Sequence, residues 1–163
     1  MIRAAYEMNG PVYIRLGRSP ILVFHEESYD FQIGKAEVVK EGTDAAIIST
    51  GIMVYEAMKA ADALAEKGIH VRVINMPTIK PIDKEAILAA AKECKKIVTV
   101  EEHNIYGGLG EAVCAVVSEG YPVPVKRIGV NDAFGKSGSA DEVLAAYGLT
   151  DAKIAEITAQ FIA

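Results

Sequence analysis

The sequence predicts an α/β domain in which a parallel sheet is covered by helices on both faces. From residue 35 onward, short apolar segments typical of buried strands alternate with longer segments whose apolar residues recur at helical spacing. Hydrophobic residues make up 51% and charged residues 24% of the chain, a balance that supports a packed core. The length of 163 residues fits about one domain.

Composition also excludes several classes of protein. The net charge of -5 offers no basic surface to nucleic acid or to an anionic membrane, so we expect neither as a partner. Two cysteines are too few for a disulfide scaffold. No apolar run reaches the roughly 18 residues that a membrane span needs, and the first residues lack the apolar stretch of a signal peptide. We therefore expect a cytoplasmic protein.

The beginning of the chain differs from the rest. Residues 2–8 are predicted to end a helix at Asn9-Gly10-Pro11, and alternation over 12–16 predicts a half-buried strand. Neither element has a partner nearby, so we interpret them as the tail of a unit that lies upstream. Residues 17–34 show no periodicity and are predicted to form an ordered connector between two domains.

The remaining elements are predicted in alternation. Strands are expected at 35–39, 45–49, 71–74, 97–100 and 123–128. Helices are expected at 51–66, 84–92, 109–117, 140–147 and 151–162. The segment 45–49 is continuously apolar, as in a strand buried on both faces, and Asp83 is placed to cap the helix that follows it. Read locally, the first two strands would pair as a hairpin.

Ligands of open α/β sheets gather at the carboxyl ends of the strands. The most polar of these ends is residues 101–110, which follow a strand and open a helix. Backbone N–H groups at such a helix start attract anions. The candidates for this crevice or anion site are Gly51, Glu101, Glu102, His103, Gly107, Gly108 and Gly110. The spacing is not that of a dinucleotide site, and we favour the alternative that these glycines permit close packing of helix, strand or subunit.

Glu101, Glu102 and His103 form a candidate acid–base cluster, because a carboxylate can orient a histidine that titrates near neutrality. In the alternative, one glutamate bonds backbone N–H groups and the other faces water. Adjacent strand residues point to opposite faces, so we expect no catalytic group here. The sequence has neither paired histidines nor a CxxC, so we expect no metal site either.

Arg15 and Arg18 flank the end of the predicted strand at 12–16. A guanidinium beside a glycine turn suits a phosphate or a carboxylate. The alternatives are a solvated pair of side chains and an ion pair between domains.

Several segments, in order along the chain, resemble transketolase-like thiamine diphosphate enzymes. They are Gly10–Arg18, Phe31–Ala36, Thr50-Gly51, Arg72–Met76, Ile79–Asp83, Val100–His103 with Gly107–Gly110, and Asp132–Gly138. The resemblance is strongest to the C-terminal subunit of split transketolases. It implies a stub of the pyrimidine-binding domain at 1–18, a connector at 19–34 and the C-terminal domain at 35–163.

The resemblance also implies a fold. It is a three-layer α/β/α arrangement around a mixed five-stranded sheet, mostly parallel, with the first strand antiparallel to the third and the second next to the fourth. We follow this order in place of the local hairpin. This strand order places Gly51 and the segment 101–110 beside the same crevice.

The activity that the resemblance implies is transfer of a two-carbon ketol unit between sugar phosphates in the pentose phosphate pathway. Thiamine diphosphate and Mg²⁺ would be held in the complete enzyme by a Gly-Asp-Gly…Asn motif that this sequence lacks, so we expect no cofactor on this chain. The implied partner is the upstream coenzyme-binding part, and a homo-oligomer is expected. Alone, the chain would support assembly and dimerisation and be inactive. Arg18 matches the arginine that contacts the substrate phosphate, with Arg15 as the alternative.

Other functions stay open at this point. One is a stand-alone domain that binds small anions or regulates. Another is the equivalent domain of a 2-oxo acid dehydrogenase β subunit or of a deoxyxylulose phosphate synthase. Residues 132–138 and Arg18 favour a transketolase over these.

Overall fold

A five-stranded mixed sheet forms the centre of the molecule, in the order β1-β3-β2-β4-β5. The computed structural model describes residues 1–17, 23–26 and 28–163. The strands are β1 (Glu37–Lys40), β2 (Ala45–Ser49), β3 (Val71–Asn75), β4 (Ile97–Asn104) and β5 (Val125–Val130). β1 runs antiparallel to β3, and the other pairs are parallel. The implied strand order is confirmed.

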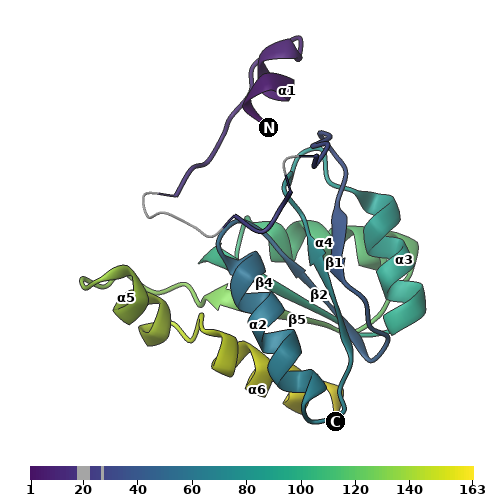
Figure 1. The fold of residues 1–163 in the computed structure, drawn as a ribbon, viewed down its shortest axis with the longest axis vertical. Helices are drawn as coiled ribbons and strands as arrows, with labels where there is room; N and C mark the ends of the chain where they lie inside the picture. The colour runs from purple at the N-terminus through teal and green to yellow at the C-terminus, as the bar shows by residue number, and fades with distance from the viewer. Residues whose placement is uncertain (18–22, 27) are drawn as a thin grey trace.

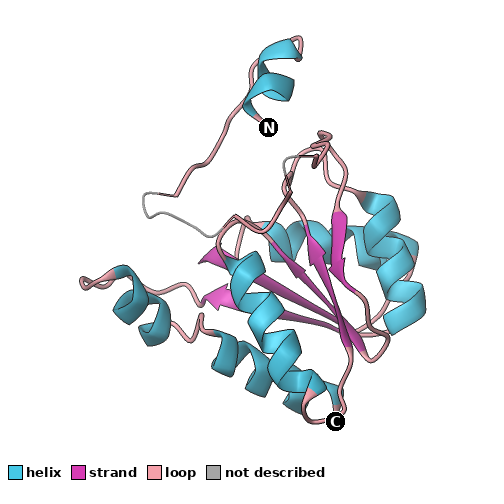
Figure 2. Cartoon of the chain, in the orientation of Figure 1, coloured by secondary structure: helices cyan, strands magenta, loops and turns pink. Residues whose placement is uncertain are grey.

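Helices cover both faces of this sheet (Figures 1 and 2). The helices of the described chain are α1 (Ile2–Glu7), α2 (Met53–Ala65), α3 (Lys84–Cys94), α4 (Leu109–Gly120), α5 (Ala140–Ala146) and α6 (Asp151–Ile162), of which α1 and α5 do not cover the sheet. α2 and α6 pack on one face, whereas α3 and α4 pack on the other. The predicted three-layer α/β/α fold is therefore confirmed.

Alternation along the strands divides the core into two clusters, one on each face. All five residues of β2 are buried; Ile47 belongs to the cluster under α2 and α6, and Ile48 to the cluster under α3 and α4. A strand buried on both faces must be apolar throughout, as this one is in all but its last residue. α3 begins where the Asp83 side chain accepts the Ala86 N–H at 3.0 Å, so the predicted cap is confirmed.

The local hairpin is wrong, because β1 pairs with β3. The turn between β1 and β2 lies against the start of β3, where the Asp44 carboxylate accepts the His70 N–H at 2.6 Å. At Gly42 a Cβ would stand 2.3 Å from the backbone carbon of Val71, so only glycine allows this approach. With the turn held there, β1 pairs with the outer edge of β3 instead of with β2.

The predicted strand over 12–16 is also wrong, since these residues form no strand in the structure. Among the described residues no strand pairs with this segment, and Tyr13 is 88% exposed. α1 is a helix as predicted, buries none of its residues and stands apart from the sheet (Figure 1). No helix in the described part of the chain is long and apolar enough to cross a membrane.

Candidate functional site

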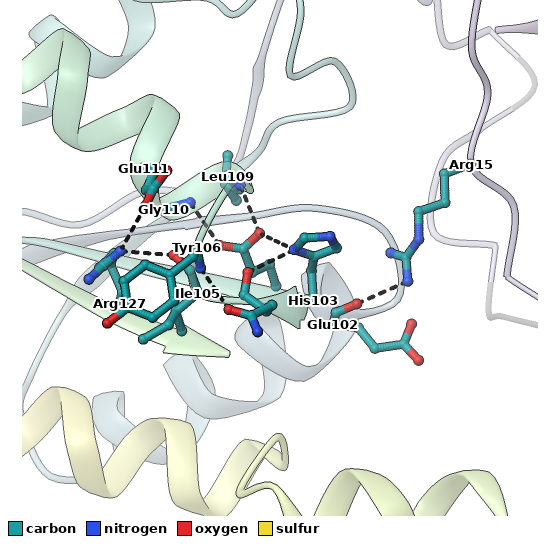
Figure 3. Close-up of polar contacts among 11 residues, drawn as sticks. Arg15, Glu102, His103, Ile105, Tyr106, Leu109, Gly110, Glu111 and Arg127 are labelled. Atoms are coloured by element: carbon teal, nitrogen blue, oxygen red, sulfur yellow. Dashed lines mark hydrogen bonds and ion pairs between the residues drawn. The ribbon is translucent and has the colours of Figure 1, made fainter. Parts of the chain in front are cut away.

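The polar end of β4 is the centre of the candidate site. The strand continues through Asn104 rather than ending at Val100 as predicted, and its last residue pairs with Val130 of β5. The side chain of Glu101 is buried, while Glu102 and His103 are exposed. Glu101 and His103 approach each other, with 4.0 Å between Oε2 and Nδ1, whereas the Glu102 carboxylate points away from them, so the three side chains do not converge (Figure 3).

Glu101 lies under the start of α4. Its carboxylate accepts the Leu109 N–H at 2.7 Å and the Gly110 N–H at 2.8 Å (Figure 3). A negative charge at a helix N-terminus is stabilised by the unpaired N–H groups and the helix dipole. The chain's own carboxylate thus occupies the two N–H groups that the anion-binding hypothesis would offer to a ligand.

The glycines of this loop make room for that carboxylate. A Cβ on Gly108 would stand 2.0 Å from Oε2 of Glu101, and one on Gly110 would stand 2.8 Å from the Arg127 side chain. Gly107 has a φ of +76°, which favours glycine. Close approach between helix and strand accounts for Gly108 and Gly110. Gly51 has a φ of +60° at the end of β2, next to β4, with open space around it.

His103 has one ring nitrogen engaged. Its Nδ1 lies 2.7 Å from the carbonyl oxygen of Asn104 and 4.0 Å from Oε2 of Glu101. A carbonyl oxygen only accepts, so Nδ1 is the donor in this contact. The Asn104 amide in turn donates to the Asp132 carboxylate at 3.1 Å.

Arg127 is a part of this region that sequence reasoning missed. It donates to the Ile105 carbonyl at 2.8 Å, lies 3.9 Å from the Glu111 carboxylate and faces the Tyr106 ring at 5.4 Å. The sequence held one signal for it. Arg127 lies within a largely apolar strand, β5, and the neighbouring strand β4 carries acidic residues near its end. The side chain holds the loop between β4 and α4 against β5.

Of the two candidate phosphate-binding arginines, the structure places one. Arg15 donates to the Glu102 carbonyl at 3.1 Å, which attaches the N-terminal segment to the end of β4 (Figure 3). Arg18 lies outside the described residues. A cavity of about 370 Å³ lies between β1 and residues 24–26 and 28–29, and Arg15 is not among the described residues that line it.

The described residues do not fit a thiamine diphosphate and Mg²⁺ site. No group of three potential metal-ligating side chains occurs among them. Glu101, the buried carboxylate at the carboxyl edge, is already committed to backbone N–H groups. On α4, burial raises the pKa of the Cys114 thiol against the opposing effect of Arg127, so this thiol stays protonated at neutral pH. No step through the coenzyme is therefore assigned to these residues.

Fold and site together define a three-layer α/β domain in which a buried glutamate of β4 occupies the N-terminus of the helix that follows it. The comparison with known families then specifies it further. The family model for the transketolase C-terminal domain matches residues 34–154. The chain belongs to the transketolase C-terminal domain family.

Its relatives are longer proteins. The chain is 43% identical over 157 residues to the 6-deoxy-6-sulfo-D-fructose transketolase subunit of Clostridium sp., covering 94% of this chain and 49% of the relative. It is 38% identical over 160 residues to the 1-deoxy-D-xylulose-5-phosphate synthase of Heliobacterium modesticaldum, covering 96% of this chain and 25% of that enzyme.

A solved structure agrees with these matches. A split-gene transketolase, described as an inactive β4 tetramer, superposes with a TM-score of 0.95 at 42% identity, covering 99% of this chain and 53% of that one. The chain thus spans about half the length of the split transketolase subunits that it matches.

Proposed function

We propose that this chain supplies the C-terminal domain of a thiamine diphosphate-dependent enzyme that transfers a two-carbon ketol unit between sugar phosphates. The observation that carries the proposal is the similarity to the split-gene transketolase, at 42% identity and a TM-score of 0.95 over 99% of the chain. A structural match at this level of identity extends beyond a shared fold.

In this proposal the coenzyme and its Mg²⁺ are held by an upstream coenzyme-binding part. The Clostridium relative is about twice as long as the matched region, so its other half is long enough to include such a part. The chain alone is inactive and supports assembly. The commitment of Glu101 to the start of α4 agrees with this division of roles. We further propose a cytoplasmic homo-oligomer in the pentose phosphate pathway, with Arg18 binding the substrate phosphate.

The decisive experiment is reconstitution. The chain is purified alone and together with the coenzyme-binding polypeptide of a split transketolase, and ketol transfer is assayed with thiamine diphosphate and Mg²⁺. We expect activity only in the mixture. Turnover by the chain alone, or micromolar binding of the coenzyme to it in calorimetry, would contradict the proposal.

The synthase relative provides a second candidate reaction, since the same domain serves that enzyme at 38% identity. The reconstituted mixture is therefore assayed also for 1-deoxy-D-xylulose 5-phosphate. A parallel assay with 6-deoxy-6-sulfo-D-fructose tests whether the donor ends in a sulfonate, as the name of the Clostridium relative indicates for that protein. We expect phosphate-bearing ketoses to be the best donors.

A further inference from the structure

Residues 131–142, called the arm below, extend from the carboxyl end of β5 through the first turn of α5. Every residue of the arm is exposed, and the segment projects from the body of the domain (Figure 1). The arm contains residues 132–138, which the sequence singles out and to which the proposed function assigns no role. Because all its residues are exposed, packing inside the domain does not explain why this segment projects.

Hydrogen bonds connect the arm to β4 and to α5 in spite of its exposure. At its base the Asp132 carboxylate accepts the Asn104 amide at 3.1 Å, and farther along the Tyr147 hydroxyl donates to the Phe134 carbonyl at 2.7 Å. A capping box joins Ser139 and Glu142 at the start of α5. These bonds order the backbone in advance, which lowers the conformational entropy lost on binding.

Phe134 is the apolar group that this arrangement presents. Its side chain is 99% exposed. Among the described residues, the other large apolar side chains more than four-fifths exposed all lie within residues 1–23. Apolar surface left in water in this way marks interaction sites.

The arm and the N-terminal segment are attached to nearly the same point. Arg15 bonds the carbonyl of Glu102, and Asp132 bonds the side chain of Asn104, two positions farther along β4. A single body seated at the end of β4 can therefore cover both exposed apolar segments. Under the proposed function, the polypeptide that continues the N-terminal segment in the longer relatives is the coenzyme-binding part.

We propose that the arm is a docking element that inserts Phe134 into an apolar pocket of the coenzyme-binding part. This inference rests on the proposed function, which supplies that partner. Aromatic side chains that enter a partner's pocket contribute a large share of binding energy. The arm would thus fix the coenzyme-binding part against the carboxyl edge of the sheet.

The test measures the solvent exposure of Phe134 directly. The chain is co-purified with the half of the Clostridium subunit that it does not match, and hydroxyl-radical footprinting is read by mass spectrometry with and without that half. We expect the oxidation rate of Phe134 to fall about tenfold in the complex. Tyr121, which is 39% exposed and follows α4 at the opposite edge of the sheet, should not change.

Phe134→Ala provides the energetic test. The variant removes a side chain that is 99% exposed, so the fold is retained. We expect the dissociation constant of the complex, measured by analytical ultracentrifugation, to rise roughly 10- to 100-fold. The matched control Tyr121→Ala removes an aromatic side chain that is 39% exposed at the opposite edge of the sheet, and it should leave the constant unchanged.

The other outcomes separate the two proposals. A complex in which Phe134 is oxidised as fast as in the free chain overturns the docking role and leaves the proposed function standing. Protection that appears in the chain alone as its concentration rises overturns the choice of partner in favour of a second copy. Absence of any complex in sedimentation overturns the proposed function, and the docking role with it.

Discussion

The buried carboxylate of Glu101 accepts the backbone N–H of Gly110 at 2.8 Å, so the end of β4 is bonded directly to the first turn of α4. The other carboxylate oxygen takes the Leu109 N–H at 2.7 Å. Two of the four N–H groups that a helix start leaves unpaired are thereby satisfied inside the domain. The same feature that suggests catalysis in the sequence serves here to join a strand to a helix.

Glu101→Gln should destabilise the domain by about 1–3 kcal/mol. The substitution keeps the size of the side chain but turns an amide NH₂ toward one of the two backbone N–H donors, leaving buried donors without an acceptor. Urea denaturation monitored by circular dichroism measures the loss. The control is Glu102→Gln, whose side chain is exposed and which should change stability by less than about 0.5 kcal/mol. Equal effects of the two variants would refute the structural role of Glu101.

Gly108→Ala should also destabilise the domain, by about 1–3 kcal/mol. Its backbone is extended, so an alanine is tolerated there, but the new Cβ would stand 2.0 Å from Oε2 of Glu101. The cost is therefore steric and depends on the glutamate. In a Glu101→Ala background the same change should cost less, giving a coupling energy of about 0.5–3 kcal/mol in a double-mutant cycle. Additive effects would show that the clash is not with Glu101.

Gly42→Ala should be among the most damaging single changes, at about 3 kcal/mol or more, because the Cβ would meet backbone atoms that cannot rotate away. Those atoms belong to His70, Val71 and Arg72, at 2.3–2.6 Å. Thermal unfolding of the variant measures the loss. Gly17→Ala is the matched control, since a Cβ there meets nothing within 4 Å and should leave the melting temperature unchanged.

Local patterns predicted most elements of this fold and failed where the deciding contact lies elsewhere in the chain. The apolar run over β2 and the cap at Asp83 are properties of a few consecutive residues, and both are confirmed. The partner of β1 depends on how Gly42 meets Val71, which no local pattern contains. At 12–16 the alternation is typical of a strand, but the part of the chain that the structure describes places no strand beside it.

The same distinction between local patterns and distant contacts applies to the candidate site. Its location at the end of β4 was predictable, because carboxyl strand ends collect polar residues. The use of Glu101 was left open between two interpretations, and only the position of α4 decides between them. Arg127 was missed because its partners, the Ile105 carbonyl and the Tyr106 ring, come from another strand end.

Acidification should loosen the start of α5. The Ser139 backbone N–H, with help from the Ser139 hydroxyl, lowers the pKa of Glu142 below its usual range. A folded-state pKa below the unfolded value stabilises the helix start above about pH 4.3, and this contribution is lost as the pH falls through the folded pKa. Amide exchange of residues 140–146 should therefore accelerate in strong acid.

An NMR titration of the glutamate carboxyl carbons checks this account. Ser139→Ala removes the hydroxyl but keeps the backbone N–H, so the pKa of Glu142 should rise part of the way toward its ordinary value. Glu156 is the internal control, because Lys153 lowers its pKa and the substitution should not affect it. A Glu142 that titrates like an exposed glutamate in the wild type would contradict the capping box.

The two arginines near the N-terminus should differ in what their loss does to catalysis. Under the proposal that Arg18 binds the substrate phosphate, Arg18→Ala in the reconstituted enzyme should raise the KM for phosphate-bearing substrates about 10- to 100-fold, because a charge-assisted hydrogen bond would be lost. Arg15→Ala removes a bond to the Glu102 carbonyl and should chiefly weaken assembly with the coenzyme-binding part. Steady-state kinetics at saturating subunit concentration separates the two effects, since only a substrate-binding defect persists there. If Arg15→Ala raises KM under those conditions and Arg18→Ala does not, the phosphate-binding role passes to Arg15.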